Sequence, residues 1–176
     1  MQESINMNRP EPSEYNEYYG KYISLVTEDD VIDALVPQPN EMRAIFKDLA
    51  EDKGLFAYAD GKWTVKEVIS HLIDVERIFA YRVLRIARGD TTPIEGYEQD
   101  GYIDNSNANG RSFIDLLDEF DLQRRSNMLF FNNLNRDGWL RQGTASGMGI
   151  SVRAIAYIMA GHVRHHMSIL KDHYHV

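Results

Sequence analysis

Three histidines in this sequence have the spacing expected of metal ligands. His162 and His166 lie four residues apart in a segment with helical periodicity, so their side chains should share one helix face, with Cβ atoms about 5–6 Å apart. Imidazole nitrogens bind first-row divalent ions at about 2.0–2.1 Å, and a catalytic site typically has three protein ligands and one open position. His71 is the only histidine outside the last fifteen residues. It is therefore the expected third ligand.

A metal ion explains these histidines better than ordinary core packing does. A single inward histidine is usually bonded to a neighbouring carbonyl, but three without partners would bury several unsatisfied polar atoms. His165 competes with His166 as the partner of His162, because a three-residue spacing also brings side chains together. The apolar residues of the segment centre the buried face between His162 and His166, which leaves His165 toward an edge with an open supporting role. His173 and His175 are expected to be exposed.

Two carboxylates close to His71 are candidates for supporting the metal site. A metal-bound histidine usually donates its other ring proton to a carboxylate or carbonyl, and Asp74 and Glu76 follow His71 closely. An equally good interpretation is that both are solvated charges paired with Arg77 or Lys66. The sequence leaves this choice open.

Two arginines and two tyrosines complete the candidate site residues. Arg82 and Arg124 each interrupt an apolar stripe, so they either pair with carboxylates inside the fold, which is favoured, or face a pocket and bind an anionic group. Residues 90–109 are polar and rich in turn formers, which predicts a long loop. Because loops of this length are often functional, Tyr97 and Tyr102 could wall the site.

Four segments with helical periodicity would position these residues. They are residues 29–49, residues 65–88, a helix that begins after Ser112, and a final helix capped by Ser151. The second is the best defined, because Thr64 and Glu67 form a capping box and Gly89 follows a cationic last turn. Pro37 and Pro39 predict a break in the first.

These segments predict an all-α four-helix bundle with a long loop between its second and third helices. Residues 1–12 are expected to be an irregular lead-in, and residues 13–176 a single domain. Tyrosines at three- and four-residue intervals predict an extra N-terminal helical segment over the body of the domain: Tyr15, Tyr18, Tyr19 and Tyr22. Residues 139–149 are expected to be a connector with a short extended pair.

Composition excludes several classes of function. With no cysteine the chain has no disulfide framework and no thiolate nucleophile, so a metal must be held by His, Asp or Glu. The net charge of −8 argues against nucleic acid as a partner. The sequence has neither an apolar run of about eighteen residues nor a signal-peptide start. We therefore expect a cytoplasmic protein without membrane contact.

Three stretches of the sequence carry a family resemblance: residues 61–77, 82–90 and 161–170. Together they resemble the DinB-like (YfiT/DinB) superfamily, and the resemblance covers roughly residues 29–174. It implies a four-helix bundle, usually a homodimer, in which His71, His162 and His166 hold a divalent metal ion. Members include thiol S-transferases that use bacillithiol, mycothiol or glutathione, and proteins called metal-dependent hydrolases.

Residues and resemblance together predict a metal-dependent enzyme that acts on a small molecule. The ion would lower the pKa of water or of a low-molecular-weight thiol to make a nucleophile, and a histidine-rich ligand set suits zinc or nickel. The alternative is a non-catalytic metal-binding or stress-related binding protein in which the ion is structural. A fourth ligand such as Glu76 or His165 would favour that alternative. An open site beside Tyr97 or Tyr102 would favour the enzyme.

Overall fold

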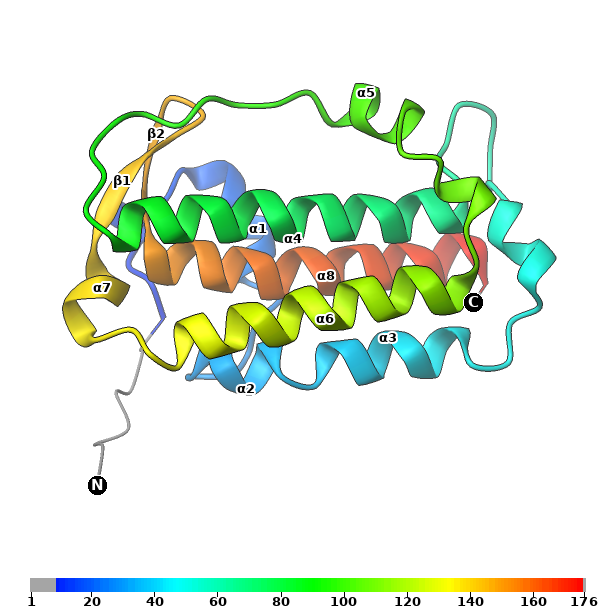
Figure 1. Ribbon diagram of the computed structural model, residues 1–176, viewed down its shortest axis with the longest axis horizontal. Helices are drawn as coiled ribbons and strands as arrows, with labels where there is room; N and C mark the ends of the chain where they lie inside the picture. Colours follow the sequence, from blue (N-terminus) through cyan, green and yellow to red (C-terminus); the bar gives the residue numbers. More distant parts are fainter. Residues whose placement is uncertain (1–8, 176) are drawn as a thin grey trace.

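The computed structural model describes residues 9–175, and its helices form a four-helix bundle with a short hairpin at one end (Figure 1). Three positions of the bundle hold long helices and the fourth holds two short ones in series. These elements are α4 (Val65–Ala87), α6 (Phe113–Phe131), α8 (Val152–Tyr174), and α2 (Val31–Leu35) followed by α3 (Gln38–Phe46). The predicted all-α bundle is confirmed.

The two helices that carry the histidines begin at side-chain caps. At α4 the Thr64 hydroxyl accepts a hydrogen bond from the Glu67 backbone at 3.2 Å, and the Glu67 carboxylate accepts one from the Thr64 backbone at 2.7 Å. At α8 the Ser151 hydroxyl accepts one from the Ala154 backbone at 3.0 Å. These bonds satisfy donors that a helix start leaves free, so the beginning of each helix is set by its own sequence.

The predicted break in the first bundle segment lies between α2 and α3, at Pro37. Proline lacks the N–H that an uninterrupted helix needs but fits the first turn of a new one. The new helix places Gln38, which is fully buried, at its start. A short 3₁₀ helix, Glu51–Leu55, then leads toward α4.

The N-terminal tyrosine segment forms short helices packed on the bundle. They are Pro12–Glu14 and Glu17–Tyr19, both 3₁₀, and α1 (Gly20–Ile23), which contacts α8. Gly161 of α8 allows this contact, because a Cβ atom there would overlap the carbonyl oxygen of Tyr22. Residues 1–8 of the predicted lead-in lie outside the described residues, and its boundary at residue 12 stays a prediction.

Gly161→Ala is expected to destabilise the protein by about 1–3 kcal/mol, a typical cost of overpacking. The clash involves a backbone oxygen that cannot rotate away, so it should outweigh the roughly 1 kcal/mol that alanine gains over glycine in a helix. Urea unfolding measures the change. Gly101→Ala, where a Cβ atom meets nothing within 4 Å, is the control and should not lower stability. Equal stability of the Gly161→Ala variant and the parent would contradict the described contact of α1 with α8.

The connection between α4 and α6 is not the plain loop that the sequence predicts. It contains α5 (Gln99–Asp104) and a 3₁₀ helix (Ala108–Gly110), and it returns along the length of α4 (Figure 1). Glycine and turn-forming residues weaken the local helical signal here. Burial of Ile103 and Ala108 stabilises the two short helices instead, and this tertiary contribution is absent from local periodicity.

The connector before α8 contains the expected extended pair and also a helix that was not expected. Helix α7 (Arg136–Leu140) is capped by Asn135, and strands β1 (Gln142–Ala145) and β2 (Met148–Ser151) form an antiparallel hairpin. Ser146 and Gly147 have φ of 52° and 75° at its turn, as a two-residue hairpin turn with right-handed strand twist requires. The Ile94 backbone pairs with β1 through bonds of 2.9 Å to Thr144 and Ser146, so the hairpin also anchors the start of the connection.

Two apolar clusters fill the bundle, and buried polar residues lie between them. One cluster contains the hairpin, α2 and the first part of α8, and the other contains α3 and the first parts of α4 and α6. Arg124 on α6 and His162 on α8 lie between the stretches that belong to the two clusters. Among the helices of the described residues, none is long and apolar enough to cross a membrane.

Candidate metal centre

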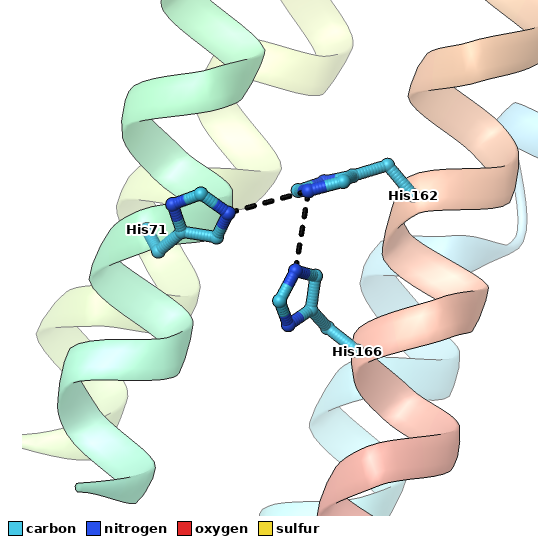
Figure 2. A group of neighbouring side chains, drawn as sticks. All are labelled: His71, His162 and His166. Atoms are coloured by element: carbon cyan, nitrogen blue, oxygen red, sulfur yellow. Dashed lines mark hydrogen bonds between the residues drawn. The ribbon is translucent and has the colours of Figure 1, made fainter. Parts of the chain in front are cut away.

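The structure brings the three predicted histidines together between α4 and α8 (Figure 2). His162 Nε2 lies 3.2 Å from His71 Nε2 and 3.2 Å from His166 Nε2. One ligand atom from each ring lies within 4.8 Å of the other two. His71 comes from α4 and the other two from successive turns of α8, so this cluster links two neighbouring helices.

The geometry and chemistry of the three rings fit a divalent ion. Two ligand atoms bound at about 2.0–2.1 Å to one tetrahedral ion lie about 3.4 Å apart. This is close to the 3.2 Å that separates His162 Nε2 from each of the other two Nε2 atoms, and all three ligand atoms lie within 4.8 Å of one another. Nitrogen donors of this kind suit zinc, nickel, copper or iron better than magnesium or calcium. The three histidines therefore form a candidate site for a first-row metal, and their assignment as ligands stays a prediction.

Burial keeps these histidines neutral, which is the form that binds metal. Removal from solvent lowers the pKa of His71 to about 4 and contributes most to lowering the pKa of His166 to about 3. The pKa of His162 is also well below its usual range, through burial first and then the neighbouring histidines. At neutral pH their ring nitrogens therefore carry lone pairs that a cation can use.

The metal-free protein is expected to lose stability as the pH falls below about 6.5. In the unfolded chain His71 titrates near 6.5, but in the folded protein its pKa is about 4. Between these values the unfolded state binds more protons, so for this residue the free energy of unfolding should fall by up to about 1.4 kcal/mol per pH unit. Urea unfolding of chelated protein from pH 7.0 to 5.5 measures the slope, above the range in which most carboxylates titrate.

His71→Gln should reduce this slope, whereas substitution of the exposed His173 to alanine should not. A slope that is the same in His71→Gln and in the parent would mean that His71 does not titrate as its burial requires.

Two aromatic residues beside the cluster were not identified from the sequence. The Trp63 ring lies 4.8 Å from the His71 ring, and the Tyr22 ring lies 5.3 Å from the rings of both His162 and His165. Burial raises the pKa of Tyr22, so its hydroxyl stays protonated. Gly161, directly before His162, was the sequence signal that another backbone approaches α8 at this point, and in the structure that backbone is the one at Tyr22.

Both carboxylates near His71 have arginine partners in the structure. Glu76 is buried and accepts hydrogen bonds from Arg124 at 2.8 and 2.9 Å and from Asn127 at 2.8 Å. Asp74 is half-buried and lies 3.8 Å from Arg77, which matches the alternative that it is an ordinary paired charge. Glu76 fits neither interpretation, because it is neither solvated nor paired with the residues that were considered.

His165 lies next to the cluster without joining it. Its ring is 5.2 Å from that of His166 and half-buried, and it is absent from the group of converging ligand atoms in the described part of the chain. Within that part, no carboxylate or fourth histidine converges with the three rings. The fourth-ligand arrangement that would favour a structural ion is therefore not formed by Glu76 or His165.

The two inward arginines have different surroundings. Arg124 donates to the Glu76 carboxylate, to the Gln38 side chain at 2.7 Å and to the Leu35 carbonyl at 2.9 Å, as the favoured interpretation requires. Arg82 instead lines a pocket with Tyr97 and Tyr102, the pair that was expected to wall the site. None of the three histidines lines this pocket, so Tyr97 and Tyr102 line a different site from the one formed by the histidines.

Comparisons with known proteins agree with the fold. A family model described as the DinB superfamily matches residues 34–170. Among solved structures the chain is similar to YfiT from Bacillus subtilis, which is described as a probable metal-dependent hydrolase with an unusual four-helix bundle topology. The TM-score is 0.73 at 17% identity, covering 93% of this chain and 90% of that one. No curated protein matches. Because the family model spans most of the sequence, the protein belongs to the DinB superfamily.

Proposed function

We propose that this protein is a metal-dependent hydrolase whose divalent ion is held by His71, His162 and His166. The observation that carries the proposal is the convergence of three imidazole nitrogens within 4.8 Å, from the buried His71 and His162 and the half-buried His166. When bound there, a divalent ion would act as a Lewis acid and lower the pKa of a water ligand. The description of YfiT as a probable metal-dependent hydrolase supports the same reaction class.

The chain's own residues would prepare this site by burial and by orientation. The α4 and α8 backbones fix the three rings, because each histidine lies well inside a 23-residue helix. Trp63 covers His71, and Tyr22 lies against His162. These rings limit the access of solvent to the ligands and restrict their rotation, which preorganises the site. Zinc or nickel is the proposed ion.

Thiol transfer is the second candidate, and a purely structural ion is the third. A low-molecular-weight thiol would occupy the position that water takes in hydrolysis, so both reactions need the same three histidines. A structural ion would be favoured by a fourth protein ligand, and Glu76, the acidic candidate for that role, is engaged by Arg124. Among the described residues no fourth ligand atom converges with the three histidines, which supports chemistry over a structural role.

The test is a metal-reconstitution assay. Protein treated with chelator and then loaded with zinc or nickel is screened against ester and amide substrates, and separately for thiol transfer with bacillithiol, mycothiol and glutathione. Hydrolysis of at least one substrate that is lost on chelation and restored by metal would support the proposal, with His162→Ala as the inactive control. Thiol transfer without hydrolysis would select the second candidate. Stoichiometric metal with neither activity would favour the structural ion.

A further inference from the structure

Arg82 is a buried arginine that has no carboxylate partner. The residue is 2% exposed, and within residues 9–175 no acidic group lies at ion-pair distance from it. Its Nη2 donates to the Ser146 hydroxyl at 2.8 Å, and its Nε is buried without an acceptor. Buried charges in proteins are normally paired, and an unmatched one is costly. Among the described residues, the guanidinium therefore has no anionic partner.

Arg124 shows what the same side chain does when its partner is internal. Its Nε and Nη2 donate to the two oxygens of Glu76 at 2.8 and 2.9 Å, a bidentate arrangement. In Arg82 the Nη2 atom donates to one neutral hydroxyl, and the Nε atom has no acceptor. The Nε–Nη2 edge of an arginine can bind a carboxylate or phosphate in a bidentate way, and in Arg82 this edge makes only one hydrogen bond.

A cavity of about 470 Å³ lies beside this guanidinium. Its size is in the range of small-molecule sites, and three tyrosines contribute to its lining: Tyr81, Tyr97 and Tyr102. The Tyr97 and Tyr102 rings are 5.3 Å apart, and the Arg82 guanidinium lies 5.9 Å from the Tyr97 ring centre. Flat aromatic surfaces next to a buried cation suit a ligand that has both a ring and an anionic group.

The other charges around the cavity are already compensated or exposed. Arg85 donates to the Asp90 carboxylate at 2.6 Å, and Arg77 is paired with Glu119. Glu95 is exposed at the cavity lining, so water solvates its charge. Arg82 is therefore the lining cation whose charge the described residues do not balance.

The hairpin and the start of the connection hold the cavity wall in place. Ile94 pairs with β1 on both sides of Ala145, which fixes the following Gly96 and Tyr97 near the hairpin turn. The hairpin turn places the Ser146 hydroxyl where it accepts a hydrogen bond from Arg82. A site of this kind is formed before any ligand arrives, and such preorganisation lowers the cost of binding.

We propose that this cavity binds the oxyanion, carboxylate or phosphate, of a small molecule that carries an aromatic ring, with Arg82 as its anchor. The site goes beyond the proposed hydrolase function and does not depend on metal. Arg82 follows His71 by eleven residues on the same face of α4, which separates the two by about 16 Å along the helix.

Calorimetry with three matched probes tests the proposal on the full chain: benzoate, phenyl phosphate and the uncharged benzamide. At least one anionic probe should bind about tenfold or more tightly than benzamide, because charge-assisted hydrogen bonds are the stronger kind. The anionic probe that binds more tightly, benzoate or phenyl phosphate, shows whether the site prefers a carboxylate or a phosphate. Binding should be equal in chelated and zinc-loaded protein, so failure of the metal proposal would not affect the result.

Arg82→Gln should weaken the anionic probe about tenfold or more and leave benzamide unchanged. Arg85→Gln is the matched control on the same lining and should stay within about threefold, because Asp90 already neutralises that arginine. If Arg82→Gln does not fold, Arg82→Lys decides, since it keeps the charge but loses the planar fork and should also bind the anion more weakly. Equal affinity for all three probes, or unchanged anion affinity in the folded Arg82 variant, would overturn the proposal.

Discussion

Substitution of one member of the buried Arg124–Glu76 pair is expected to destabilise the bundle by about 3–5 kcal/mol. Arg124 is 1% and Glu76 2% exposed, so either variant, Arg124→Met or Glu76→Gln, leaves a buried polar group without its partner. The effect should extend beyond the pair, because Arg124 also holds Gln38, which donates to the Ala160 carbonyl at 2.8 Å. This network joins α3, α4, α6 and α8. Urea unfolding measures the loss.

A double variant, Arg124→Met with Glu76→Leu, separates pairing from packing. It removes both charges, so it should recover a large part of the stability that either single change loses. Arg125→Met is the surface control, since Arg125 forms a comparable bidentate pair with Asp121 at 2.8 Å but is exposed. That variant should leave the unfolding midpoint unchanged. If the Arg124→Met and Glu76→Gln variants lose as little stability as the surface control, the description of Arg124 and Glu76 as a desolvated ion pair would be contradicted.

Alanine substitution of any of the three clustered histidines is expected to abolish stoichiometric metal binding. Loss of a residue that only supports a ligand costs about 10–100-fold in metal affinity, so loss of a ligand itself should cost more than about 100-fold. His71, His162 and His166 should behave alike, because each supplies one of three converging nitrogens. Metal analysis after dialysis measures occupancy. Trp63, 4.8 Å from His71, offers a local readout through fluorescence quenching by Cu²⁺ or Ni²⁺.

Two neighbouring histidines serve as controls for this result. His165→Ala removes a ring that adjoins the cluster, and His173→Ala removes an exposed ring near the C-terminus. Both should keep one metal ion per chain, with affinity within about tenfold of the parent. Circular dichroism confirms that each variant is folded. Full occupancy in a folded His71→Ala, His162→Ala or His166→Ala protein would remove that residue from the ligand set.

The helices and the inward faces of the histidines could be predicted because their causes are local. A capping box begins α4, a serine caps α8, and proline separates α2 from α3, and each of these signals lies within a few residues. The periodicity of apolar residues then shows which side of each helix is buried. His71 and His162 lie on those sides. Local signals were therefore enough to predict that the candidate ligands face the interior of the bundle.

What could not be predicted depends on contacts between distant residues. Glu76 and Arg124 are 48 residues apart, and periodicity shows that both face inward without showing which charges meet. The same limit applies to Arg82, whose environment is set by the hairpin and the connection. Tyr22 approaches His162 only because Gly161 admits its backbone. Helix α5 forms through burial against α4, a tertiary effect that its glycine and turn residues conceal.

The most direct test of the metal centre is anomalous X-ray scattering at the zinc edge from crystals of the zinc-saturated full chain. One anomalous peak per chain is expected, at about 2.0–2.1 Å from the Nε2 atoms of His71, His162 and His166. A peak at other residues, or no peak among these three rings in zinc-saturated crystals, would contradict the three-histidine site.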